Sequence, residues 1–144
     1  MINKIDSILT ALKTRLRTAG IQSVLEFPEG LRHIGNKFPM AMIMLDGESN
    51  IGDQAGQLEV DCAISLYIVT QHGVNVLKQH NDVLYAAQNA IYLDTDLGGA
   101  ACITYPSGLK WNSDIPGLPS TGLRDDLMIT EITLNLKYIN QRLN

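Results

Sequence analysis

The sequence predicts an α+β fold in which two helices pack on one face of a mostly antiparallel sheet. Two segments carry apolar residues at steps of three and four, and others alternate apolar and polar residues. These elements come in the order helix, strand, strand, helix, strand. Because helices and strands are partly segregated, this order indicates an α+β arrangement. At 144 residues the chain is expected to form one domain, residues 1–144.

The first helix is expected over residues 3–18. Its basic residues fall mostly off the apolar stripe, and Gly20 stands where a left-handed residue often ends a helix. A short apolar piece, residues 24–27, follows, and residues 28–30 turn the chain. The stripe itself consists of Ile2, Ile5, Ile8, Leu9, Leu12 and Leu16.

Residues 38–45 are apolar on both faces, which is typical of a strand covered on both sides. Met40, Met42 and Met44 are spaced by two and share one face. Same-face neighbours on a strand lie about 6.5–7 Å apart, which is too wide for three thioethers to hold one copper ion. We therefore expect these methionines to fill gaps in the core under a helix.

Residues 46–57, DGESNIGDQAGQ, are rich in glycine and polar side chains and predict a flexible hairpin loop. A loop of this length is unusual in a hairpin and is typical of a functional segment. Its candidate residues for contacts with other subunits or with a partner protein are Glu48, Ser49, Asn50 and Asp53. The alternation that follows, from residue 58 to residue 68, predicts a long half-buried strand.

A second helix is expected over residues 74–93, with an inner face made by Leu77, His80, Leu84, Ala87 and Ile91. Residues 94–126 are rich in glycine and proline and predict a second flexible loop, in which only residues 109–111 resemble a strand. Alternation returns over residues 127–139 and predicts the last strand.

No pattern in the chain predicts a catalytic, cofactor or metal site, so we expect a protein that is not an enzyme. His80 is expected to be half-buried with one nitrogen satisfied, and no H-x-x-H, G-x-G-x-x-G or G-x-S-x-G motif occurs. The acidic pairs Asp94/Asp96 and Asp125/Asp126 are typical of turns. The remote alternative is a small acidic hydrolase or ligand-binding domain that uses them.

The net charge of −4 and a pI near 5.2 argue against a nucleic-acid-binding protein. Residues 1–37 are nevertheless net basic, with Lys13, Arg15 and Arg17 on the first helix, whereas the remainder is strongly acidic. Such a bipolar chain can pair end to end with copies of itself.

Nothing in the sequence is typical of a signal peptide or a membrane span. The chain contains two cysteines, Cys62 and Cys102. Both are expected to be reduced, buried thiols.

The residues around the methionine strand carry a family resemblance. Phe38-Pro39 before the strand, and Leu45-x-Gly47 with a polar segment after it, resemble the tail-terminator proteins of tailed bacteriophages. This family includes the lambda minor tail protein U and its relatives in Mu-like phages and prophages. The order of predicted elements is also similar, although the segment 94–126 is longer than in the family pattern.

The resemblance implies a structural protein without cofactors. It would form a hexameric ring on the finished tail tube, end tail polymerisation and present a surface to the head-completion proteins. Its partners would be copies of itself, the tube protein and the connector, and its place the virion tail, after assembly in the bacterial cytoplasm. Another head–tail joining or tail-completion protein is the alternative within the same class.

Overall fold

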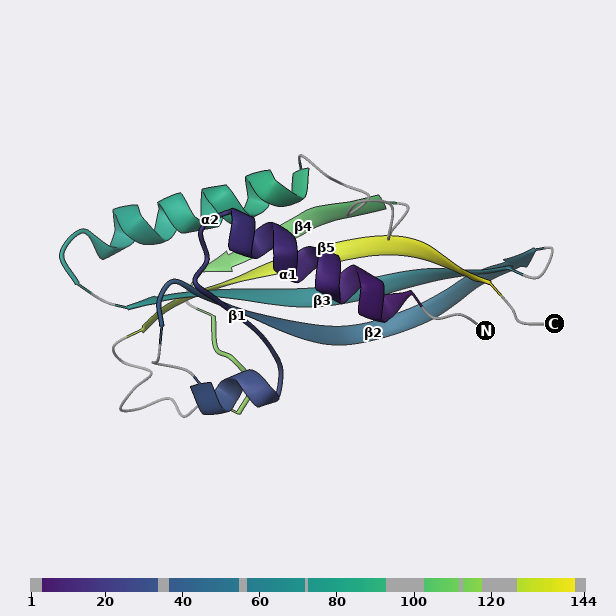
Figure 1. Cartoon of the computed structure of the whole chain (residues 1–144), viewed down its shortest axis with the longest axis horizontal. Helices are drawn as coiled ribbons and strands as arrows, with labels where there is room; N and C mark the ends of the chain where they lie inside the picture. Colours follow the sequence, from purple (N-terminus) through teal and green to yellow (C-terminus); the bar gives the residue numbers. More distant parts are fainter. Residues whose placement is uncertain are drawn as a thin grey trace.

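A five-stranded sheet in the order β1-β2-β3-β5-β4 organises the computed structural model (Figure 1). The structure describes residues 4–33, 37–54, 57–71, 73–92, 103–111, 113–117 and 127–141. Its elements are α1 (Ile5–Thr18), β1 (Ser23–Glu26), the 3-10 helix η1 (Glu29–His33), β2 (Met40–Gln54), β3 (Gln57–Gln71), α2 (Val76–Tyr92), β4 (Ile103–Trp111) and β5 (Leu127–Gln141). The predicted α+β class, with two helices on a mostly antiparallel sheet, is confirmed.

The strand β3 is the centre of the sheet. It pairs antiparallel with β5 without a break, from Gln57↔Gln141 to Gln71↔Leu127, and with β2 on its other side. β4 pairs antiparallel with β5, whereas β1 is parallel to the first residues of β2. Every paired row of side chains therefore continues across several strands.

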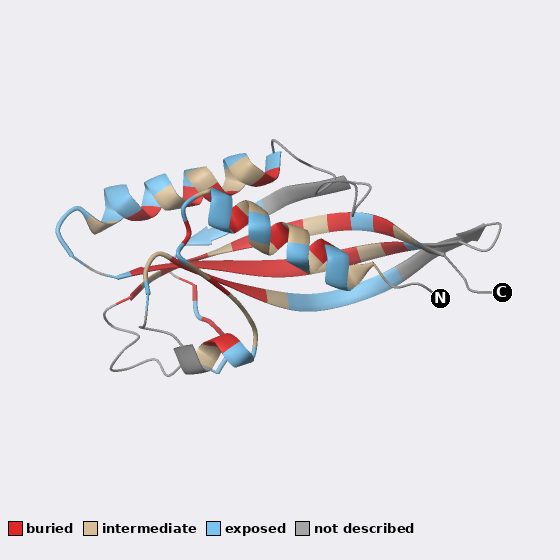
Figure 2. Ribbon diagram, viewed as in Figure 1, coloured by how far each residue is buried: buried red, intermediate tan, exposed pale blue. Residues whose placement is uncertain are grey.

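One face of the sheet holds the larger core, under α1 and α2 (Figures 1 and 2). Ile8, Leu12 and Leu16 of α1 are fully buried against it, as the helical spacing predicted. On α2 the predicted inner face is confirmed except for Leu77, which is 61% exposed. A helix turns about 100° per residue, so Leu77 lies about 60° from His80 and falls on the flank of the helix.

The methionines pack on the opposite face, in a second core. Met40 and Met42 are fully buried there, while Met44 is partly buried at its border. A Cβ on Gly30 of η1 would lie 2.9 Å from the Met42 methyl carbon, so the methionine side chain packs directly on that glycine. The predicted core role is confirmed, but the cover is η1 and nearby loops rather than α1 or α2.

The prediction of a loop over residues 46–57 is wrong. β2 continues to Gln54 and β3 begins at Gln57, so the two strands pair through most of this segment. Two bulges, between Leu45 and Gly47 and between Asn50 and Gly52, accommodate the glycines. Glycine and acidic residues usually indicate a loop, whereas here they lie on a bulged strand in which Leu45–Ser49 are exposed.

The prediction of a loop over residues 94–126 is wrong in its middle part. β4 covers Ile103–Trp111, well beyond the strand-like piece 109–111. Pro106 is accommodated because β4 is an edge strand, and a bulge follows it at Gly108. The acidic pairs Asp94/Asp96 and Asp125/Asp126 lie outside the described residues.

His80 is fully buried and uses both ring nitrogens, so the expected half-buried position is corrected. Nδ1 lies 2.7 Å from the Thr70 hydroxyl of β3, and Nε2 lies 2.7 Å from the Thr130 hydroxyl of β5. The second partner is fifty residues away in sequence and was invisible to local spacing. The pair of bonds ties α2 to two neighbouring strands.

Replacing Met42 by Asp should destabilise the protein by about 3–5 kcal/mol, because a carboxylate would be buried in the second core without a partner. Urea denaturation followed by circular dichroism measures the loss. The control Ser49→Ala, at an exposed position on the same strand, should change stability by less than about 0.5 kcal/mol. A Met42→Asp protein with the wild-type midpoint would contradict the placement of this strand.

Candidate functional site: the outer sheet and its flanks

The strands β2, β3 and β5 run together past the N-terminal end of α1 (Figure 1), and we call the surface formed by their outer halves the outer sheet. It comprises residues 45–54 of β2, 57–65 of β3 and 133–141 of β5. Along β2 the side chains change from buried to exposed as the strand leaves the body (Figure 2). The register puts small and polar residues on the face turned away from the helices: Ser49, Asp61, Ala63, Ser65, Thr133, Asn135 and Lys137.

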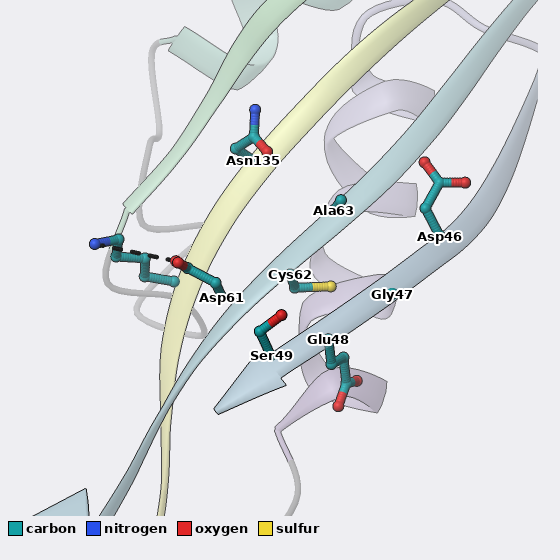
Figure 3. Close-up of a pocket in the computed structure, with 9 residues that line it drawn as sticks. Asp46, Gly47, Glu48, Ser49, Asp61, Cys62, Ala63 and Asn135 are labelled. Carbon is teal, nitrogen blue, oxygen red and sulfur yellow. Dashed lines mark ion pairs between the residues drawn. The ribbon is translucent and has the colours of Figure 1, made fainter. Parts of the chain in front are cut away.

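An open hollow of about 520 Å³ lies on the outer sheet (Figure 3). Ser65 donates a 2.6 Å hydrogen bond to a carboxylate oxygen of Asp46, and the Lys137 ammonium lies 4.0 Å from the Asp61 carboxylate. Three carboxylates against one ammonium make the hollow acidic. Its lining residues are Asp46, Gly47, Glu48, Ser49, Asp61, Cys62, Ala63, Asn135 and Lys137.

Two buried groups at or near the hollow have raised pKa values. Burial, with the nearby carboxylates of Glu48 and Asp46, raises the pKa of the Cys62 thiol to about 12. At neutral pH this thiol is therefore protonated and is a poor nucleophile. Burial also raises the pKa of the Tyr138 phenol, and Glu48 adds to that rise. Among the described residues, no group of three or more His, Cys, Asp or Glu side chains is arranged to hold a metal ion.

The four candidate contacts of the segment 46–57 all lie on the outer part of β2. Glu48 and Ser49 are exposed and line the hollow. Asn50 pairs with Val60 of β3, and Asp53 pairs with Leu58. The structure thus brings these predicted contact residues together, on a strand rather than on a loop.

The three basic candidates on α1 separate onto two sides of the helix. The Lys13 ammonium forms a 2.8 Å ion pair with the Glu26 carboxylate of β1. Arg17 is exposed and, being four residues on, shares that flank with Lys13. Arg15 instead lines a groove between α1 and α2, together with Ala86 and Asn89. Lys13 and Arg17 therefore face the β1 and β2 side of the molecule, and Arg15 does not.

The structure has a second exposed surface that the sequence did not predict, and we call it the β4 flank. It consists of Leu77, Tyr85 and Tyr92 of α2 with Leu109 and Trp111 of β4, all of them large and substantially exposed. The three α2 residues lie within about 80° of one another around the helix, on the side away from the groove with α1. The only sequence pattern that could have indicated this surface is the alternation of apolar and polar residues at Leu109, Lys110 and Trp111.

Neither a protein-family model nor a curated protein matches the chain. Within the described part of the chain, no helix combines the length and the apolar character needed to cross a membrane.

In a Cys102→Ser variant, where Cys62 is the remaining thiol, labelling by Ellman's reagent at pH 8 should be about a thousandfold slower in the native protein than in urea. A pKa near 12 leaves very little thiolate at this pH, whereas an ordinary thiol is substantially ionised. Native labelling should accelerate as the pH rises, because deprotonation supplies the nucleophile. Rapid native labelling at pH 8 would contradict this account of the Cys62 environment.

Proposed function

We propose that the chain is a structural tail protein of a bacteriophage or prophage, a tail terminator that closes the tail tube as a hexameric ring. In this role it ends tail polymerisation and forms the surface to which the head joins. The observation that carries the proposal is the outer sheet, whose face turned away from the helices carries small and polar side chains on three neighbouring strands, with Ser49 and Lys137 exposed. The assignment to a phage tail is based on the sequence resemblance around Phe38, Pro39, Leu45 and Gly47.

Two exposed sheet edges support assembly with other copies. Natural proteins usually cover such edges, because unpaired N–H and C=O groups invite pairing with another chain. In the described residues, β4 has no partner on its outer side, and neither does β2 beyond Ile43. In a ring, each subunit meets its neighbour through two different surfaces, and rotation closes the contact. The two edges of this sheet suit such a contact.

The uneven charge suits the same assembly. Lys13 and Arg17 lie on one flank of α1, whereas Asp46, Glu48 and Asp61 gather on the outer sheet. Charge complementarity between different surfaces fixes the direction in which subunits join and speeds their encounter. An acidic subunit also suits a conduit through which DNA must pass without being held.

The partners in this proposal are further copies of the chain, the tail tube protein and the head-completion protein. Assembly takes place in the bacterial cytoplasm, and the finished protein belongs to the virion tail. The ends of β2, β3 and β5 project past α1 (Figure 1), so they offer extended backbone to the end of a tube. No cofactor or metal takes part.

Electron microscopy of the purified protein mixed with tail tubes of its own phage should show one ring at one end of each tube. Tubes assembled in its presence should stop growing once the ring is bound. Free, unbound particles beside tubes of unlimited length would contradict the proposed function. Tubes of an unrelated phage serve as the control, because only the cognate end should be recognised.

Reversing the charge of Lys13, Arg15 and Arg17 together to Glu should weaken ring assembly, and the loss should be largest at low salt because salt screens charge pairing. Sedimentation velocity at two salt concentrations measures the effect. A charge-conserving triple variant, Lys13→Arg with Arg15→Lys and Arg17→Lys, is the matched control and should assemble normally. Unchanged assembly of the reversed protein at both salt concentrations would reject a role for these residues.

A further inference from the structure

We propose that Ile103–Gly108 of β4 in one copy pair antiparallel with residues 44–49 of β2 in the next copy, so that neighbouring sheets join into one continuous sheet. The inference rests on the proposed ring and identifies the surfaces that close it. It depends on four properties of the two edge strands: the direction in which they run, their position along the register rows of the sheet, their exposed apolar side chains and their charged residues.

The direction of the strands permits the pairing. β2, β3, β5 and β4 are neighbours in that order, and each pairs antiparallel with the next. Four alternating strands leave the two outer strands running in opposite directions. When copies stand side by side in the same orientation, β4 of one therefore meets β2 of the next as an antiparallel pair, the more stable pairing per residue.

The two free edges also lie at the same level of the sheet. One continuous row runs from Leu45 on β2 through Ile64 and Leu134 to Pro106 on β4. Among the described residues, β1 pairs with β2 only over Met40–Ile43, and no strand pairs with the outer edge of β2 from Met44 on. Ile103–Gly108 of β4 lie level with Met44–Ser49, so they would face this edge in a neighbour, whereas Leu109–Trp111 lie level with the residues that β1 covers.

Exposed apolar side chains lie along both edges. Leu45 on β2 is 44% exposed, and Leu109 and Trp111 on β4 are 44% and 40% exposed. By register all three lie on the helix-covered face of the sheet, and Leu109 lies one same-face step from the row of Leu45. Edge pairing at this level would place Leu45 of one copy diagonally beside Leu109 of its neighbour and remove both side chains from water, whereas Trp111 would lie level with β1.

Charge favours unlike edges over like edges. The outer part of β2 carries Asp46, Glu48 and Asp53 and no basic residue, whereas β4 carries Lys110 and no acidic residue. Pairing β2 with a second β2 would place carboxylates opposite carboxylates, which is destabilising. Pairing β2 with β4 avoids this repulsion, so the partner of each edge is the other edge of a second copy.

The main chain of β2 presents a suitable donor at Leu45. The Phe27 amide donates to the Ile43 carbonyl over 2.8 Å, so the main chain of Ile43 points away from β3. Two residues on, and before the bulge, Leu45 has the same orientation and directs its N–H outward. Replacing Leu45 by Pro would remove this donor and leave the bonds between β2 and β3 in place.

The first experiment compares Leu45→Pro with Leu45→Ala. Both lose the leucine side chain, but only the proline variant loses the outward N–H. Analytical ultracentrifugation should show assembly weakened at least about tenfold more by Pro than by Ala, the equivalent of one lost hydrogen bond. Circular dichroism first shows that each variant is folded. Equal assembly of two folded variants would overturn the pairing through this edge.

The second experiment mixes two variants that damage different edges. Leu45→Pro leaves β4 intact, and Leu109→Glu leaves β2 intact. Each variant alone should remain monomeric, because every junction would contain one damaged edge. An equal mixture, with one variant labelled with nitrogen-15, should give heterodimers in native mass spectrometry. Asn89→Glu, an exposed position on the α1 side of α2, is the control and should assemble like the wild type.

The outcomes separate this inference from the proposed function. Rings that form from either variant alone, or a wild-type chain that stays monomeric at its highest soluble concentration, overturn the edge pairing. Normal assembly of Leu109→Glu alone would point to a β2–β2 contact and also overturns it. Rings that require both edges but do not bind tail tubes support the edge pairing and contradict the proposed function.

Discussion

The unbroken pairing of β3 with β5 is the constraint on which the rest of the structure depends. The two strands pair residue for residue from Gln57 to Gln71, and apolar residues alternate with polar or small ones from Leu58 to Leu66 of β3 and from Ile132 to Tyr138 of β5. Because a shift of one residue would turn every side chain to the wrong face, this ladder fixes which residues meet α1 and α2 and which meet η1. Both cores, and the polar face of the outer sheet, follow from that single register.

The same register explains how the second helix is placed. Thr70 on β3 and Thr130 on β5 present their hydroxyls to the two nitrogens of His80, so α2 is held by polar contacts as well as by Leu84, Ala87 and Ile91. A buried imidazole costs free energy unless both nitrogens find partners, and here both do. The position of α2 in turn leaves its outer flank, with Leu77, Tyr85 and Tyr92, beside the edge strand β4.

Periodicity in the sequence was enough to predict both helices, the central strands and the core role of the methionines. It failed where polar and glycine-rich segments form strands, because β2 beyond Leu45 and β4 owe their structure to pairing with β3 and β5 rather than to local preference. The two bulges of β2 and the proline at position 106 of β4 also interrupt the patterns by which strands are predicted from sequence.

The candidate contact residues were only partly predictable. Glu48 and Ser49 were found from composition, although for the wrong reason, since they lie on a strand. Helical geometry alone puts Arg15 on a different side of α1 from Lys13 and Arg17. That Arg15 lines a groove with α2 could be known only from the position of α2. The β4 flank combines residues of α2 and β4 that are distant in sequence, so no local pattern could reveal it.

In our account, the ring and its contacts come from one property of the fold, a four-stranded antiparallel core whose two edges are open and unlike. The most direct test is hydrogen–deuterium exchange of the wild-type protein in its assembled and dissociated states. Edge pairing predicts that the amides of residues 44–49 and of residues 103–108 become protected together on assembly, while residues 62–68 of β3 are unchanged. Protection of other segments, with both edges exchanging as fast as in the dissociated protein, would contradict the account.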